Sequence, residues 1–303
     1  MAFQVAAGWN NLPNGNFVPT IFSQKVQKFF RRESVVEAIT NTDYYGEIAE
    51  FGDTVRIIKE PVITVAPYAR GTTVLPQALA DDDFSLTVDQ ANYFSFKVDD
   101  IENKQAHVNW EELATSSGAY SLKDTFDKEI LTYMVSQVST SSPNMVYGTQ
   151  AAPLTVGFAS GNVSPLAVLN RLSRLLDEQN IPSDNRWCVA PPIFWEKMAD
   201  ESSKLIGIDW QSSGSDGSIL RNGKLLNALI RGFDCYRSNN MPLDSSSQNQ
   251  VLVGHMSSTA TASQIAKVEK FRDPNSFADV VRGLHMFGRK TLRTSAMGLT
   301  HFV

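Results

Sequence analysis

The sequence predicts an α+β protein, because the spacing of its apolar residues changes along the chain. Between residues 84 and 98 the apolar side chains fall on every second position, which is typical of a strand with one buried face. Between residues 122 and 138 they recur every four positions, which is typical of a helix. A central region that mixes helices with strands, followed by a final return to strands, completes the pattern.

The first 24 residues predict an extended arm, since Asn, Gly and Pro are scattered through residues 10–16 and no apolar period persists. A short helix is expected at about 20–40. Its basic residues are interpreted as a solvated helix face, and they are Lys25, Lys28, Arg31 and Arg32.

A long two-stranded ribbon is predicted next. Residues 54–58 and 62–65 are rich in β-branched side chains, and a second run from Phe84 to Val98 has its apolar residues on even positions. A ribbon with one apolar face is marginally stable alone, so it needs the rest of this chain or a neighbouring subunit to cover it. The long loop between the arms, at about 66–83, favours contact with something outside a compact domain.

The region after the ribbon predicts two well-defined helices. The first begins near Trp110 and ends at Ser139–Pro143, and its apolar stripe consists of Leu122, Phe126, Ile130, Met134 and Val138. The second begins at Ser164–Pro165, where a capping hydroxyl precedes a proline in the first turn. Its expected buried face consists of Leu166, Leu169, Leu172, Leu175 and Leu176.

The remaining elements are shorter. Residues 186–190 predict a buried strand, and the two prolines that follow open a helix containing Phe194, Trp195 and Met198. Further strands are expected at 251–254, 278–281 and 284–287. This alternation makes the region 165–258 a compact mixed unit.

The composition excludes several classes of protein. Of 303 residues, 42% are apolar and only 19% are charged, below the roughly 25% typical of soluble domains. A net charge of −5 argues against a wholly basic nucleic-acid-binding surface. No apolar run is long enough for a transmembrane helix, and the first residues lack a secretion signal, so we expect synthesis in a cytoplasm. Two cysteines are too few for a disulfide framework.

No motif in the sequence predicts catalysis. There is no phosphate-binding loop and no nucleophile elbow, and the four histidines lack the spacing of metal ligands. Paired acids occur at Asp81–Asp83, Asp99–Asp100 and Glu111–Glu112, but nothing in the sequence positions them for acid/base work. We therefore predict no catalytic, cofactor-binding or metal-binding residues. A cytosolic hydrolase that uses a carboxylate pair remains an alternative.

Three stretches together carry a resemblance. They are Phe94–Glu102 with the later segment Phe126–Leu131, then Gly232–Pro242, and then Gly283–Thr291. In their order and spacing the chain resembles the major capsid proteins of tailed bacteriophages with the Hong Kong 97 fold, over essentially its whole length.

The resemblance implies five segments. They are an N-terminal arm and short helix at 1–48, an extended β-ribbon or E-loop at 49–100, a spine helix with the first part of a peripheral domain at 101–164, an axial domain at 165–258, and the second part of the peripheral domain at 259–303.

The resemblance also implies a function and partners. We expect an icosahedral shell of pentamers and hexamers that encloses double-stranded DNA, assembled in the host bacterial cytoplasm and located in the virion. A separate scaffold protein is expected because the chain starts at a short arm; a portal and a decoration protein are further expected partners. The last 41 residues contain seven basic and three acidic residues, and this local excess of positive charge fits weak, non-specific contacts with DNA. No cofactor and no membrane partner are expected. An encapsulin-type nanocompartment is the alternative with the same fold.

The predicted inter-subunit contacts lie on the ribbon. Apolar packing is assigned to Phe84, Leu86 and Val88, and charge pairing to Arg70, Asp81, Asp82 and Asp83. Many weak contacts of this kind, repeated around a closed symmetry, would hold a shell together. The loop at 66–83 contains no lysine, so the covalent Lys–Asn cross-linking of some family members is not expected there.

Overall fold

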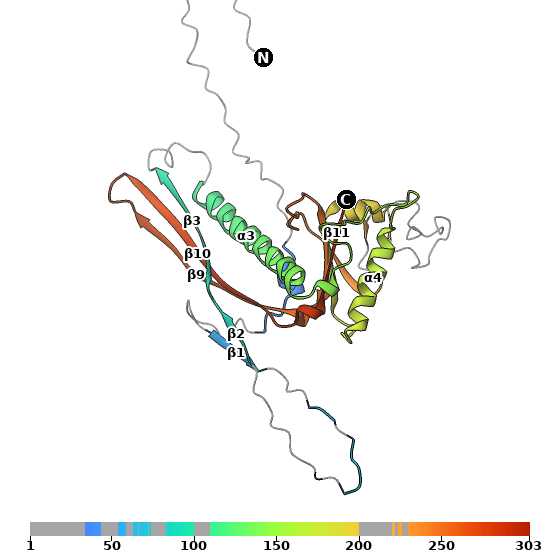
Figure 1. The fold of residues 1–303 in the computed structure, drawn as a ribbon. Coiled ribbons are helices and arrows are strands. Elements are labelled where there is room, and N and C mark those ends of the chain that lie inside the picture. Colours follow the sequence, from blue (N-terminus) through green and yellow to red (C-terminus); the bar gives the residue numbers. More distant parts are fainter. Residues whose placement is uncertain are drawn as a thin grey trace, which may run out of the picture.

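The computed structural model of the chain confirms a mixed helix and sheet architecture (Figure 1). The structure describes residues 34–43, 54–58, 63–65, 67–71, 73, 83–99, 110–199, 220–221, 224–225 and 230–303. The predicted arm at 1–24 with its basic residues therefore lies outside the described residues, and so do Asp81 and Asp82.

The helices are α1 (Val36–Ile39), α3 (Trp110–Ser141), α4 (Pro165–Glu178) and α5 (Pro192–Met198), with short 3₁₀ turns η1 (Pro143–Met145), η3 (Met256–Ser258) and η4 (Thr294–Ala296). The strands are β1 (Thr54–Ile58), β2 (Asp83–Thr87), β3 (Gln90–Asp99), β4 (Arg186–Ala190), β5 (Leu220–Arg221), β6 (Lys224–Leu225), β7 (Phe233–Arg237), β8 (Asn249–His255), β9 (Thr259–Arg272), β10 (Ala278–Thr291) and β11 (Met297–Phe302). No helix in the described part of the chain is long and apolar enough to cross a membrane.

The predicted strand from Phe84 to Val98 is two strands rather than one. β2 pairs antiparallel with β1, whereas β3 pairs antiparallel with β10 in a sheet of order β3-β10-β9. The ribbon therefore consists of β1 and β2, and the expectation of one continuous strand is wrong. The even-numbered side chains still share one face, because β3 alternates between half-buried even and mostly exposed odd positions.

The helix α3 covers that face of the three-stranded sheet (Figure 1). Its predicted start at Trp110 and its end near residue 140 are confirmed. The stripe is buried at Phe126, Ile130, Met134 and Val138, while Leu122 is half-buried. Near the start of the helix, the Phe94 ring lies between Gly118 of α3 and Gly283 of β10, where a Cβ atom would sit 2.9 Å and 2.4 Å from ring carbons.

A second sheet, of order β11-β8-β4-β7, forms the compact part of the molecule. Every residue of β4 and β11 is buried. The predicted cap of α4 is confirmed, because the Ser164 hydroxyl accepts a hydrogen bond from the Ala167 N–H at 3.2 Å. The last strand, β11, pairs with β8, so the chain returns at its end to the sheet of the 165–258 region.

One buried carboxylate joins three distant segments. Asp127 of α3 is fully buried, and its Oδ1 accepts hydrogen bonds from the Val35 and Val36 N–H groups at 2.9 and 3.0 Å. Its Oδ2 accepts a hydrogen bond from the Asn240 side chain at 2.9 Å. Asp127 thereby holds α1 and the turn after β7 against α3, which links two of the stretches that carry the family resemblance.

Candidate functional site

The ribbon leaves apolar side chains uncovered towards its tip. At its base, Leu86 and Val88 are 0% and 3% exposed, because they pack with Ala260 and Ala262 of β9. Towards its tip, apolar side chains become exposed, namely Ile58, Ile63, Val65 and Tyr68 at 79%, 67%, 91% and 71%. The described tip residues lie well away from the body of the molecule (Figure 1). An apolar tip of this kind marks a surface for a partner.

The predicted apolar contacts divide into two groups. The chain itself already buries Leu86 and Val88, so these two side chains do not face outward in the single subunit. Phe84 lies opposite Ile57 in the ribbon and is half-buried. The assignment of these residues to an inter-subunit contact stays a prediction, and Phe84 is the member of the set that remains accessible to a neighbour.

The predicted charged contacts are at the surface. Arg70 is exposed, in a turn that the positive φ of Gly71, 93°, completes. Asp83 is exposed and lies 3.6 Å from the Arg56 guanidinium within the same ribbon, so it already has a charge partner in the chain. Exposed pairs of this kind contribute about 0–1 kcal/mol to stability.

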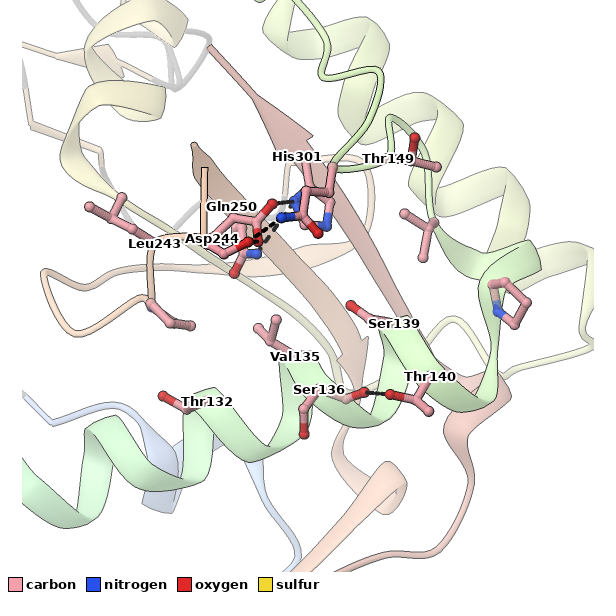
Figure 2. Close-up of a pocket in the computed structure, with 15 residues that line it drawn as sticks. Thr132, Val135, Ser136, Ser139, Thr140, Thr149, Leu243, Asp244, Gln250 and His301 are labelled. Carbon is pink, nitrogen blue, oxygen red and sulfur yellow. Dashed lines mark hydrogen bonds and ion pairs between the residues drawn. The ribbon is translucent and has the colours of Figure 1, made fainter. Parts of the chain in front are cut away.

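A pocket of about 510 Å³ lies between the C-terminal half of α3, the loop after β7 and the strands β8 and β11. Figure 2 shows Val135 and Ser139 of α3 pointing towards a polar group formed by Asp244, Gln250 and His301. The rest of the lining mixes hydroxyls with apolar side chains such as Leu243, which is 61% exposed. The lining contains no lysine and no arginine.

The polar group of the pocket is nearly buried and is short of hydrogen-bond donors. The Asp244 Oδ2 lies 3.2 Å from the His301 Nδ1, and the Gln250 Nε2 lies 3.4 Å from the same nitrogen. Burial lowers the pKa of His301 below its ordinary value, although Asp244 opposes this shift. Among the described residues, the Asp244 Oδ2 and the Gln250 Oε1 have no hydrogen-bond partner.

Sequence reasoning did not find this group. Its three members lie in a loop and on two separate strands, so no spacing along the chain relates them. Asp127 lies in the stretch Phe126–Leu131 that carries the family resemblance, but the sequence assigns no role to it. Both are recognised only through contacts between segments far apart in sequence.

The described carboxylates that do meet have structural partners rather than catalytic ones. The Asn240 side chain donates hydrogen bonds to Asp124 and Asp127, both at 2.9 Å, and Lys128 pairs with Asp124 at 2.8 Å. No group of three or more metal-ligating side chains occurs among the described residues. Cys188 is buried beside Cys235 on the paired strands β4 and β7, and this burial and contact raise the pKa of Cys188.

No family model matches the sequence, and no curated protein sequence matches it either. Solved structures, however, match almost all of the chain. A chain from Mycobacterium phage Che8 is 26% identical, with 94% of this chain and 97% of that chain covered and a TM-score of 0.75. The capsid of cyanophage P-SCSP1u is 16% identical, with 97% and 96% covered and a TM-score of 0.71. The capsid of Ralstonia phage GP4 is 13% identical, with 100% and 99% covered and a TM-score of 0.61.

This chain has the fold of a phage capsid protein. The resemblance to tailed-phage capsid proteins is thereby confirmed, and the match spans the ribbon, the spine helix and both sheets. The P-SCSP1u and GP4 structures are capsids, and this chain shares their fold over almost its whole length. The comparisons support neither the hydrolase nor the encapsulin alternative.

Proposed function

We propose that this protein is the major capsid protein of the Hong Kong 97 type, which assembles as pentamers and hexamers into an icosahedral shell around double-stranded DNA. The observation that carries the proposal is the ribbon. The likeness to capsid structures extends over almost the whole chain, and the tip of the ribbon exposes Ile58, Val65 and Tyr68 to solvent. Such side chains are stabilised when another surface covers them, at about 25 cal/mol per Å² of apolar area.

The proposal assigns a role to each of the five segments defined from the sequence. The ribbon at 49–100 would reach a neighbouring subunit, with Phe84 as part of the contact. The spine helix and the peripheral parts at 101–164 and 259–303 would form the wall, and the axial domain at 165–258 would meet its copies around the pentamer and hexamer axes. Because β11 pairs with β8, residues 297–302 at the end of the last segment would belong with the axial sheet rather than with the wall.

The proposal also includes partners. A scaffold protein would guide curvature, a portal would replace one pentamer, and a decoration protein would bind the outer surface. DNA would touch the inner surface weakly, through basic residues of the C-terminal region such as Lys290 of β10 and Arg293, which follows that strand. Low salt dependence of DNA retention is expected, since few phosphates would be neutralised per subunit.

Electron microscopy of the purified protein tests this function. We expect closed shells of uniform diameter, or rings of five and six subunits, when the protein is expressed alone or with the scaffold gene of the same phage. Nuclease-resistant double-stranded DNA should be recovered from virions that contain the protein. A species of 33.5 kDa that forms no ring or shell even with the scaffold present would contradict the proposal.

A further inference from the structure

The pocket between α3, β8 and β11 contains more acceptors than donors. The His301 Nδ1 offers one position, and both the Asp244 Oδ2 and the Gln250 amide lie close to it. If Nδ1 carries a proton, it can donate to the Asp244 Oδ2 but cannot accept from the amide; if Nδ1 accepts from the amide, the Asp244 Oδ2 has no donor, although Oδ1 still accepts from the Ser245 N–H. Exchanging the positions of the Gln250 amide oxygen and nitrogen only leaves a different acceptor unsatisfied. At least one buried acceptor is therefore left over in every arrangement.

The wall of the pocket adds further acceptors. Three hydroxyls of α3 donate their protons to helix carbonyls, Thr132 to Lys128, Ser136 to Tyr133 and Thr140 to Ser136, each at 2.7 Å. Their oxygen lone pairs are left to face other groups. Thr132, Ser136 and Thr140 are exposed, so water reaches their oxygens, whereas Gln250 is only 3% exposed and the Asp244 side chain only 11%. The Asp244 Oδ1 accepts a hydrogen bond from the Ser245 N–H at 2.6 Å, and a cationic donor would stabilise the nearly buried Oδ2 of the same carboxylate.

A guanidinium group is the donor that fits best. It carries five N–H donors in a plane and binds a carboxylate through two parallel hydrogen bonds, so it can satisfy Asp244 and neighbouring oxygens together. His301 is the one basic side chain in the pocket lining, and burial lowers its pKa. The stem of the arginine and its neighbours would lie against the apolar part of the lining, which includes Val146, Pro242 and Leu243.

The ribbon tip carries a suitable arginine. Arg70 is exposed and has no ion pair or hydrogen bond among the described residues, whereas Arg56 on the same ribbon is paired with Asp83. Its neighbours Val65 and Tyr68 are 91% and 71% exposed and match the apolar wall. In Figure 1 the described part of the tip projects away from the body, so the pocket of the same chain is not its partner.

We propose that this pocket receives the ribbon tip of a neighbouring copy of the chain, with the Arg70 guanidinium of one subunit bound to Asp244, Gln250 and the α3 hydroxyls of the next. The inference rests on the proposed shell and names the surface that receives its ribbon. It also explains why the tip and the pocket each remain unsatisfied within a single chain.

A charge exchange tests the pairing. R70E and D244K each place like charges together, so each should reduce shell yield about tenfold or more, and the double variant R70E/D244K should recover most of it. Yield is measured by sedimentation of shells from equal amounts of soluble protein. R237E, which makes the same charge change on another exposed arginine, is the matched control and should assemble normally.

A cross-link provides a second measurement, which does not depend on whether the D244K variant folds. Cysteines at Arg70 and Leu243, both exposed, are introduced into a C188S/C235S background, and assembled shells are treated with a mild oxidant. We expect a ladder at multiples of 33.5 kDa on non-reducing gels and none from either single cysteine variant. Normal shells that give only monomer, or normal yield from R70E, would overturn the docking site while leaving the shell function intact. If the unaltered protein forms no shell or ring, the proposed function itself fails.

Discussion

The two large sheets of this protein differ in how much of them the chain covers. In the four-stranded sheet, β4 and β11 are buried at every position, because α4 and the end of α3 pack on it. In the three-stranded sheet, α3 covers one face, and the other leaves Tyr93 76% exposed. At the far end of the same sheet, Phe277 in the turn between β9 and β10 is 80% exposed.

This difference in coverage indicates which parts of the chain stabilise the single subunit and which parts are left to contact other subunits. In the four-stranded sheet, every side chain of β4 and β11 is covered within the chain itself. The three-stranded sheet and the ribbon that continues from it expose apolar side chains that a monomeric protein would rarely keep in solvent as a group. The low share of charged residues, 19%, agrees with this, because the centres of interfaces are depleted in charge. We therefore expect mutations at the buried positions of β4 and β11 to change subunit stability, and mutations of the exposed apolar side chains of the ribbon and the three-stranded sheet to change assembly.

The largest effect is expected from Phe302→Ala in the closed sheet. Phe302 is fully buried, and its ring lies 5.5 Å from the Phe194 ring in an edge arrangement. The cavity should lower the free energy of unfolding by about 3–5 kcal/mol, measured by urea denaturation of the purified subunit. Phe277→Ala is the control and should change it by less than about 0.5 kcal/mol. Equal losses from the two variants would remove the distinction between the sheets.

An intermediate effect is expected from Gly283→Ala in the three-stranded sheet. The new Cβ would lie 2.4 Å from the Phe94 ring, so the ring must move away from its place beside Gly118. We expect a loss of about 1–3 kcal/mol in the free energy of unfolding, which is typical of overpacking.

The double variant Phe94→Ala/Gly283→Ala checks this cause. Removing the ring removes the clash, so the two losses should sum to more than the loss of the double variant. If urea denaturation shows that the losses of the two single variants add up to the loss of the double variant, the close approach of Phe94 to position 283 is not the cause of the loss in Gly283→Ala.

The smallest effect concerns pH and compares one histidine from each sheet. Burial lowers the pKa of His285 in the three-stranded sheet and of His301 in the four-stranded sheet below the ordinary 6.5. The unfolded chain therefore binds these protons more readily, so the stability is complete above pH 6.5 and falls as the pH drops below 6.5 towards the folded pKa values. Urea midpoints between pH 7.5 and 5.5 measure this slope. His285→Gln and His301→Gln should each reduce it, and an unchanged slope in both variants would contradict the assignment.

Much of the fold could be predicted because its signals are local. The alternation on even positions, the stripe of α3 and the Ser164–Pro165 helix start each depend on residues within one or two turns of each other, and all three are confirmed. The division of the run from Phe84 to Val98 could not be predicted. It occurs because β2 pairs with β1 whereas β3 pairs with β10. No residue inside the run indicates which strand each half will pair with.

The sequence alone therefore determined the periodicity, the helix ends, the absence of catalytic motifs and the presence of a ribbon, because backbone geometry ties each of these to neighbouring residues. Only the tertiary structure decided which apolar side chains of the ribbon are covered, since Leu86 and Val88 meet β9 while Val65 and Tyr68 meet nothing in the described chain. It also brought together Asp244, Gln250 and His301, whose shared shortage of donors exists only where three separate segments meet.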